Sequence, residues 1–495
     1  MTTFYQIPLV VNTPGLFAEF DSSRAARGLA PIPHVSLLVG QMLSTGSATA
    51  GVPVLVESKE TALILFGKKS ILAQQAAAYK AVDPLTELWA IPLADEAGGT
   101  AATGGIAVAG TATEAGECPL YVGGRRVAVA VTVGMTAAQF ETAAVAAFNA
   151  ASVTDLPVAA AADGVGTAVL FTANHKGTAG NDIQLGVALI PGERAPSGLT
   201  FTITAMSGGA TDPDYATAVT ALSDDQYHTI ASGLNASTQI AKLITELESR
   251  WGAMRQIDGH LFWAKPDTQG NLTSAGNGYN TPNGSLVGFE KSALTPLPWE
   301  VAARAAATDA TVTKSDPALP RTGLSLGGYA AHRGPARFTR AQRDILLSDG
   351  VSTVLAGSDG RMLVERLVTT YQTNGLGIPD TAYQDIMSVR TLGALRYTLR
   401  ALIGTKFARC KLMDEPTGNT KIPDNTVTPS IVRAEILAWY KQCQEDRGWV
   451  ENFAAFEEQL RVERDNSDPN RLNMFVPTDL MNSFLVGAIK IAFTR

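Results

Sequence analysis

The chain has few of the residues that cross-link a protein or bind metals. Its 495 residues include three cysteines, Cys118, Cys410 and Cys443, which lie far apart. An odd and sparse count cannot form a disulfide framework, and no C-x-x-C spacing indicates a zinc site. The five histidines contain no H-x-x-x-H pair. We therefore expect a reducing environment during folding and no metal or other cofactor.

Charged residues are also scarce, and the net charge is negative, whereas a nucleic-acid-binding face is positive. Charged residues make up 17% of the chain, and the net charge is −7. A broad nucleic-acid or membrane surface would need a basic excess. No run of about 18 apolar residues occurs, so no membrane-spanning helix is predicted. The N-terminus lacks the basic start and long apolar run of a signal peptide. We expect no direct nucleic-acid or membrane partner.

The length predicts three or four domains, and the fold class is mixed α/β. Residues 34–40 and 88–93 are buried-strand candidates that flank a helical stretch at 59–80. Residues 98–210 contain only eleven charged residues, and short Thr/Val/Ala-rich runs alternate there with Gly and Pro. Together with one helix near 136–150, this pattern indicates a β-rich domain inserted into a loop of an α/β core.

The α/β pattern resumes near Asp214. Apolar residues at helical spacing predict a helix after Ser237, and 261–264 is a short strand. Residues 266–285, rich in Asn, Gly, Thr and Ser, are expected to form a loop. Thr339 and Gln342 have capping-box spacing, followed by a hairpin at 351–371 and a long helix at 383–403. Pro429 is well placed to begin another helix, with Val432, Ile436, Trp439, Tyr440 and Cys443 on one face.

The predicted division has six parts. They are an N-terminal arm (1–22), the first part of the core (23–97), the inserted β-rich domain (98–210), the second part of the core (211–375), a C-terminal domain (376–483) and a C-terminal arm (484–495).

Both arms have the alternation of a strand with one apolar face. The alternating residues are Tyr5, Ile7, Leu9 and Val11 at the start and Ile489, Ile491 and Phe493 at the end. Each segment is either a strand of its own domain or a strand donated to a neighbouring molecule.

The enzyme motifs are weak. Gly323 to Gly327 matches G-x-S-x-G, but a nucleophile elbow at Ser325 needs a strand before it and a helix after it. A proline-rich run precedes Ser325, no helix signal follows, and the only later histidine is His332, so we expect a surface loop. Residues 66–70 resemble the end of a P-loop, but Ala62 stands where the first glycine should be. We expect Lys68 and Lys69 at a helix cap.

One further group is ambiguous. Asp224, Asp225 and His228 have a spacing that would place Asp224 and His228 on one helical face. They form either a metal site or, as we expect, an ordinary helix N-terminus.

Several segments, taken together and in order, resemble the Mu-type tail sheath proteins of contractile phages. The similar segments are PGLFAEFD (14–21), the stretch from Phe338 to Thr353, ERLVTTYQ (365–372), PDTAY (379–383), VENF (450–453), VERD (462–465), DPNRLN (468–473) and PTDL (477–480). The resemblance covers nearly the whole chain and is loosest in 98–210. Sheaths of R-type pyocins and type VI secretion systems are related to this family.

The resemblance implies a structural protein that is not an enzyme. Such subunits stack as six-membered rings around an inner tail tube, exchange strands through both arms, and contract to drive the tube through the host envelope. The implied partners are other copies of the chain, the tail tube protein, and the baseplate and tail terminator proteins. The implied location is the virion tail, after assembly in the host cytoplasm.

The resemblance also gives roles to individual residues. Arm hinges are expected at Pro8, Pro14, Gly15 and Gly28. The charged stretch 431–471 is either a tube-facing surface or a solvated helix face, with Arg433, Lys441, Arg461 and Arg464 as candidate tube contacts. Two alternatives remain open: a tail tube or other self-assembling virion protein, and a serine hydrolase using Ser325.

Overall fold

The computed structural model describes residues 32–150, 155–330, 337–416 and 421–494. Two compact units are present: a core unit of 33–394 with 482–494, and a C-terminal unit of 395–481. Their boundary lies inside helix α9 (Ile386–Phe407), whereas the sequence analysis placed a boundary at 375/376. Because one helix crosses the boundary, no loop or change of composition marks it in the sequence.

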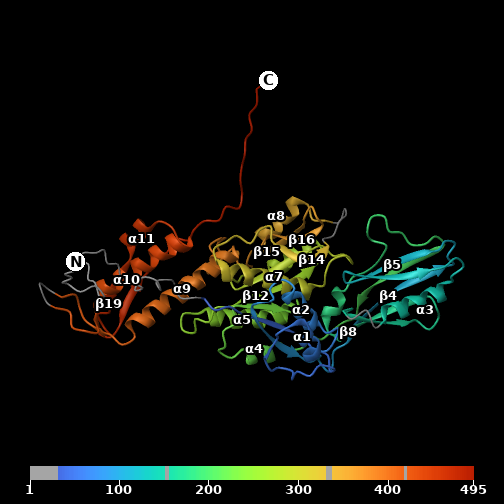
Figure 1. The fold of residues 1–495 in the computed structure, drawn as a ribbon, viewed down its shortest axis with the longest axis horizontal. Helices are drawn as coiled ribbons and strands as arrows, with labels where there is room; N and C mark the ends of the chain where they lie inside the picture. Colours follow the sequence, from blue (N-terminus) through green and yellow to red (C-terminus); the bar gives the residue numbers. More distant parts are fainter. Residues whose placement is uncertain (1–31, 151–154, 331–336, 417–420, 495) are drawn as a thin grey trace, which may run out of the picture. The chain divides into compact units, whose positions relative to one another are not determined.

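A nine-stranded mixed sheet organises the core unit (Figure 1). Six central strands are parallel, and the sheet becomes antiparallel at both ends, where β2 pairs with β3 and β16 pairs with β15 and β14. In spatial order the strands are β14 (Ser325–Ala330), β16 (Arg361–Arg366), β15 (Val351–Ala356), β13 (Gly284–Phe289), β12 (His260–Pro266), β11 (Thr229–Ser232), β1 (Val35–Gln41), β3 (Glu87–Leu93) and β2 (Val54–Leu55).

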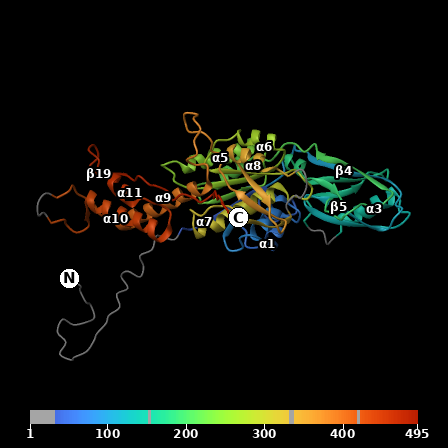
Figure 2. The ribbon, with the colours of Figure 1, turned by 90° about the horizontal axis from the view of Figure 1, so that it is seen from above.

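Helices cover both faces of this sheet, as its near-continuous apolar strands require. Along β1, Leu37 and Val39 belong to one buried cluster and Leu38 to the other, because successive side chains point to opposite faces. Figure 2 places α5 and α6 on one side of the core and α7 and α1 on the other. The core helices are α1 (Lys59–Phe66), α2 (Ile71–Lys80), α4 (Ala216–Leu222), α5 (Ser237–Trp251), α6 (Gln269–Gly276), α7 (Pro298–Ser315) and α8 (Arg340–Ser348).

Residues 101–207 form two small antiparallel sheets and a helix. One sheet has the order β10-β4-β8-β7 and the other β6-β5-β9. The isolated pair Thr100–Ala210 brings the two ends of the segment together, as an insertion requires. The elements are β4 (Ala101–Gly110), β5 (Gly116–Val122), β6 (Arg125–Val131), α3 (Ala137–Phe148), β7 (Val158–Ala162), β8 (Ala168–Lys176), the 3-10 turn η2 (Thr178–Asp182), β9 (Leu185–Val187) and β10 (Leu199–Ser207).

Buried polar contacts dock this insertion firmly on the core. Arg125 of β6 forms a two-pronged ion pair with Glu300 at the start of α7. His175 of β8 bonds Asp95 at 2.7 Å through Nδ1, and its Nε2 accepts the Ile71 N–H that begins α2. The insertion therefore also provides the hydrogen-bond acceptor for the first backbone N–H of the core helix α2.

The C-terminal unit is built on α9 and α10 (Pro429–Gln442). The predicted apolar face of α10 is confirmed: Trp439 donates to Thr398 Oγ1 at 3.1 Å, and Tyr440 stacks on Phe456 with ring centroids 3.6 Å apart. The remaining elements are β17 (Lys411–Leu412), β18 (Thr426–Val427), the π-helical turn η3 (Cys443–Arg447), α11 (Phe453–Gln459), β19 (Arg461–Arg464) and β20 (Leu472–Phe475).

Several local predictions need correction. The expected loop 266–285 contains α6, which Thr268 caps by accepting from Asn271 N–H and which buries Leu272. The hairpin's second strand ends at Arg366 rather than Tyr371, and the N-cap of α5 is Ala236, with Ser237 as its first residue. The Thr339–Gln342 capping box is confirmed in both directions. None of the described helices is long and apolar enough to cross a membrane.

Candidate assembly surfaces

The G-x-S-x-G motif does not have the geometry of a nucleophile elbow. Ser325 is exposed and begins β14, so it lies on an edge strand rather than in the expected loop. Its Oγ accepts a hydrogen bond from Gly327 N–H at 3.1 Å. An elbow needs a sharp turn between a strand and a helix, and Ser325 instead stands inside a strand. His332 lies outside the described residues.

The phosphate and metal candidates have local structural roles. Ser70, rather than Lys68 or Lys69, caps α2 by accepting from Ala73 N–H at 3.1 Å. The predicted helix around Asp224 and His228 is wrong, because α4 ends at Leu222 and both residues follow it. Asp224 pairs with Arg255 at 2.8 Å. Within the described parts of the chain, no cluster of three ligating side chains fits a metal ion.

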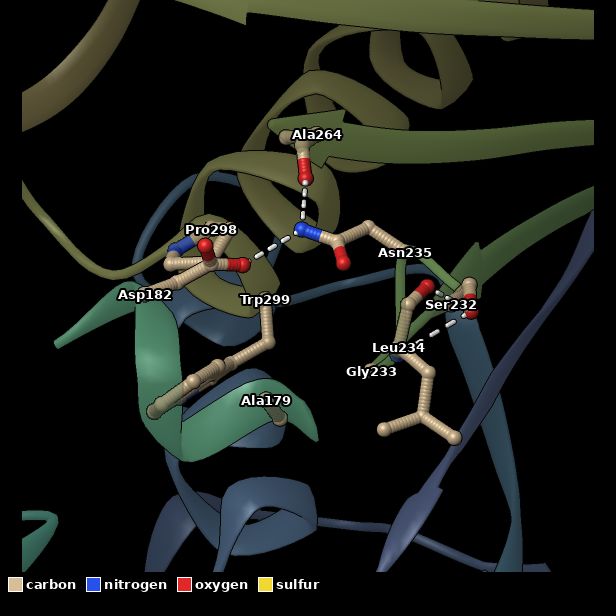
Figure 3. Close-up of a pocket in the computed structure, with 9 residues that line it drawn as sticks. All are labelled: Ala179, Asp182, Ser232, Gly233, Leu234, Asn235, Ala264, Pro298 and Trp299. Carbon is tan, nitrogen blue, oxygen red and sulfur yellow. Dashed lines mark hydrogen bonds between the residues drawn. The ribbon is translucent and has the colours of Figure 1, made fainter. Parts of the chain in front are cut away.

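The usual ligand position of an α/β sheet is filled by side chains here. After β1 the chain adds β3 on one side and later β11 on the other, so the order of strand addition switches between the parallel strands β1 and β11. Ligands commonly bind outside the carboxyl ends of strands at such a switch point. Figure 3 shows this place: Trp299 and Pro298 of α7 and Asp182 of η2 close over Ser232–Asn235. Asn235 donates to Asp182 at 2.7 Å and to Ala264 O at 3.3 Å. The remaining space does not hold one water molecule.

A larger cavity of about 240 Å³ lies on the insertion and is lined by residues 114–117 and 192–194 with Pro119, Arg126 and Pro196. It is smaller than the roughly 300–1,000 Å³ of typical ligand sites. Its charges are paired with one another, Arg126 with Glu117 and Glu193, and Arg194 with Glu114. These contacts hold the β5–β6 hairpin and the loop before β10 together.

A buried charge cluster is formed by Asp309 of α7, Arg321, and Arg390 in the second turn of α9. It lies beside the first residues of β11. Asp309 of α7 is fully buried and accepts from Arg321 Nε at 3.0 Å and Arg390 Nε at 2.9 Å. Arg390 also donates to Thr229 Oγ1 and His228 O, at the start of β11. Burial by itself raises the pKa of Asp309, but the two guanidinium charges hold it below its usual value.

Three histidines adjoin this cluster as neutral groups. His34 and His228 stack with centroids 5.1 Å apart, and His228 Nδ1 accepts from Val35 N–H at 3.1 Å. Burial and the charge of Arg390 lower the pKa of His228 to about 4. Burial, with nearby positive charge, also lowers the pKa values of His34 and His260. The cluster thus ties α7, α9 and the first residues of β1 and β11 together.

The C-terminal arm is an apolar segment without a strand partner among the described residues. Residues 482–494 form neither helix nor strand, and Figure 1 draws them as a thin red trace. Five large apolar side chains there are 82–88% exposed, namely Phe484, Val486, Ile489, Ile491 and Phe493. Water can satisfy the backbone groups of such an exposed segment, but its apolar side chains leave water only when they meet another surface.

The C-terminal unit has a sheet that is open on both sides. β19 and β20 pair in register from Arg461–Phe475 to Arg464–Leu472, and no described strand flanks either one. Phe475 is 61% exposed and Met474 is 41% exposed. A two-stranded hairpin is marginal by itself in water, and open edges accept further strands.

The four candidate tube-facing residues lie in the C-terminal unit, and each has a partner there. Arg433 donates to the carbonyls of Glu457 and Leu460 at the end of α11. Arg464 pairs with Asp414 at 2.9 Å, and Lys441 with Glu445 at 3.7 Å. Arg461 donates to Glu458 O at 3.3 Å. The N-terminal arm residues Tyr5, Ile7, Leu9 and Val11 and the hinge candidates Pro8, Pro14, Gly15 and Gly28 lie outside the described residues.

The described chain thus combines folded domains, an isolated two-stranded sheet and a terminal segment with exposed apolar side chains, and it shows no nucleophile elbow at Ser325. Family models for the phage tail sheath protein central domain and C-terminal domain match residues 208–370 and 379–494. The Mu-like prophage FluMu tail sheath protein of Haemophilus influenzae is 34% identical over 99% of both chains. The chain therefore belongs to the phage tail sheath protein family and is a virion tail component.

Solved structures share the fold. The anti-feeding prophage sheath in its contracted state aligns with a TM-score of 0.52 at 13% identity, covering 98% of this chain and 100% of that one. A sheath tail protein from Desulfitobacterium hafniense aligns with a TM-score of 0.50 at 14% identity, covering 95% and 97% of the two chains.

Proposed function

We propose that this chain polymerises as stacked six-membered rings around an inner tail tube and contracts to drive that tube through the host envelope. Family membership along the whole chain supports the proposal. The subunit is proposed to act without catalysis or a cofactor, which agrees with the filled crevice over β11 and the strand geometry at Ser325. Its proposed partners are further copies, the tail tube protein, and the baseplate and terminator proteins, assembled in the host cytoplasm.

The single observation that carries this proposal is the exposed apolar C-terminal arm. Its side chains are far more exposed than an isolated subunit in water favours. We propose that the arm pairs with the open β19–β20 sheet of a neighbouring copy, where main-chain bonds supply affinity and alternate side chains supply specificity. Tyr5, Ile7, Leu9 and Val11 are proposed to act in the same way at the other arm, with Pro8, Pro14, Gly15 and Gly28 as hinges.

A head-to-tail contact that does not close on itself produces a helical array. Two packings of the same rigid domains that differ in free energy then permit contraction without nucleotide hydrolysis. We propose the six-part division at 22/23, 97/98, 210/211, 375/376 and 483/484 as the functional modules. The insertion is proposed to face outward, and Arg433, Lys441, Arg461 and Arg464 to lie on the side towards the tube.

A pair of arm variants tests strand donation. Ile489, Ile491 and Phe493 alternate on one face, and Lys490 lies on the other. Ile491→Asp places a charge on the face that docks, so it is expected to abolish polymers at concentrations where the unmodified chain assembles. Lys490→Glu changes charge on the opposite face and is the matched control. Sedimentation measures both, and normal assembly of the Ile491→Asp chain would refute donation by this arm.

A further inference from the structure

One strand edge of the insertion has no partner among the described residues. Strand β10 lies at the end of the sheet β10-β4-β8-β7 and pairs there with β4. Its sequence, LTFTITAMS, has no charged residue, no proline and no glycine. Charges and prolines are common means by which an exposed edge strand avoids pairing with another chain. The edge of β10 is therefore suited to accept a further strand.

The hydrogen-bond pattern shows which backbone groups of β10 face outward. Val108 N–H of β4 bonds Thr167 O at 2.8 Å, so Val108 faces β8. Successive residues of a strand bond in opposite directions, so the residues next to Val108 face β10, and Thr202, which is paired with one of them, bonds β4. Phe201 and Ile203, on either side of Thr202, then point their N–H and C=O groups away from β4. These are the groups that a further strand would bind.

The apolar face of β10 is incompletely covered. Phe201 and Ile203 lie on the face where their β4 partners, Val108 and Ile106, are buried. Phe201 meets Phe140 of α3 edge-on with ring centroids 5.3 Å apart, but it is only half-buried. Ile203 is 44% exposed. A strand added beside β10 would place its own side chains next to Ile203 and extend this apolar face.

The opposite edge of the same sheet is closed by a side chain. Asn149, which follows α3, donates through Nδ2 to Ala160 O of β7 at 2.7 Å and accepts from Ala160 N–H through Oδ1 at 3.4 Å. Its amide thus makes the pair of bonds that a neighbouring strand would make. The sheet is therefore blocked at β7 and open at β10, so β7 of another copy is not the partner that β10 fits.

Two copies of the β10 edge fit each other. In an antiparallel pair centred on Thr202, Phe201 of each copy lies opposite Ile203 of the other, and these residues exchange both of their outward bonds. The apolar faces of the two sheets then coincide, and an aromatic residue opposite a β-branched one stabilises a sheet. On the other face Thr200 lies opposite Thr204, and Thr202 lies opposite its own copy. Neither strand brings a charge into the contact.

We propose that β10 pairs with β10 of a second copy of this chain and joins the two four-stranded sheets into one continuous sheet. Such a contact has a two-fold axis and closes on itself, whereas the proposed sheath is built from head-to-tail contacts. The dimer is therefore a state of subunits outside the array, in which the β10 edge is covered before assembly. This inference goes beyond the proposed function and does not depend on it.

Disulfide trapping in the full chain tests the pairing directly. The background is Cys410→Ser, because Cys410 is half-buried whereas Cys118 and Cys443 are buried. Thr202→Cys places two thiols opposite each other across the axis, where the Cα atoms are about 4.5 Å apart and a disulfide can form. Mild oxidation, below the concentration at which the chain polymerises, is expected to link most of it as dimers. Thr200→Cys is the matched control and is expected not to link, because its own copy lies about 14 Å along the strand at about 3.4 Å per residue.

A charge pair tests the same contact by sedimentation. Thr202→Lys sets like charges opposite each other and is expected to raise the dimer dissociation constant at least tenfold. An equimolar mixture of Thr202→Lys and Thr202→Glu chains is expected to restore dimers. Thr172→Lys is the control and should change nothing, because Thr172 is exposed on the same face of the sheet but on β8, away from the edge. Unchanged urea midpoints of the variants separate pairing from folding.

Linked dimers for Thr202→Cys but not for Thr200→Cys, with recovery in the mixed charge variants, support the pairing. A chain that sediments as a monomer at every concentration below polymerisation, or equal linking of the two cysteine variants, overturns it. Dimers that persist in the Thr202→Lys chain but disappear when residues 484–495 are deleted overturn β10 as the contact. The Thr202→Lys chain should still polymerise around a tail tube, and failure to do so would overturn the placement of the dimer outside the array. An unmodified chain that dimerises but never polymerises contradicts the sheath function and leaves the β10 pairing intact.

Discussion

Replacing Asp309 by asparagine should lower the free energy of unfolding of the core strongly, although the two side chains have nearly the same shape. Asp309→Asn keeps the size of the side chain but removes the carboxylate charge that pairs with both Arg321 and Arg390. The Asp309 and Arg321 side chains are fully buried, and that of Arg390 is 8% exposed. Removing one partner of a buried ion pair costs about 3–5 kcal/mol, and here two cations lose their partner, so we expect the upper part of that range.

The assay is urea unfolding of the full chain, read on the transition of the core unit, together with hydrogen exchange in β11 and the first turns of α9. Exchange should accelerate there first, because Arg390 donates to Thr229 and to His228 O. Asp359→Asn is the matched control. Its ion pair with Arg361 is 3.4 Å long with side chains 54% and 64% exposed, so a change of at most about 0.5 kcal/mol is expected. A loss below about 1 kcal/mol for Asp309→Asn would refute the reasoning.

Two further predictions concern pH and the serine motif. The pKa of His228 is lowered from 6.5 to about 4. Its contribution to the free energy of unfolding is therefore fully present above pH 6.5. That contribution is lost as the pH falls from 6.5 to 4, by about 3 kcal/mol in total, because the unfolded chain binds the proton first. Between pH 5 and 6, His228→Asn should therefore flatten the loss of stability per pH unit measured by urea unfolding, and an unchanged slope would contradict a neutral, half-buried His228. Ser325→Ala should leave assembly and sheath appearance in electron micrographs unchanged, and an assembly defect would show an unrecognised role for that side chain.

Local patterns in the sequence predicted several elements. Helical spacing located α5 and α10, which each bury one apolar face, and short continuous apolar runs located β1 and β12, which are buried on both faces. Helix α7 was not predicted, because its alanines are buried almost all round and give little contrast between faces. Helix α6 was missed for the opposite reason: its composition is that of a loop, and the Thr268 cap and burial of Leu272 decide its structure.

Contacts between residues that are far apart in the chain could not be predicted from local sequence patterns. Asp309 and Arg390 are 81 positions apart, and nothing in either local segment marks them as partners. Glu300 and Arg125, which dock the insertion, are equally unmarked. The alternation of Ile489, Ile491 and Phe493 predicted a strand at the C-terminal arm, but these residues form no strand in the described chain and their side chains are exposed. Donation of this arm to a neighbour stays a prediction.

The account is tested most directly by negative-stain electron microscopy of the purified full chain, alone and with a tail tube protein. Strand donation by the arms predicts hollow, striated cylinders wider than the tube, which disappear when residues 484–495 are deleted. Dispersed particles under both conditions, or cylinders that persist without those residues, would contradict it.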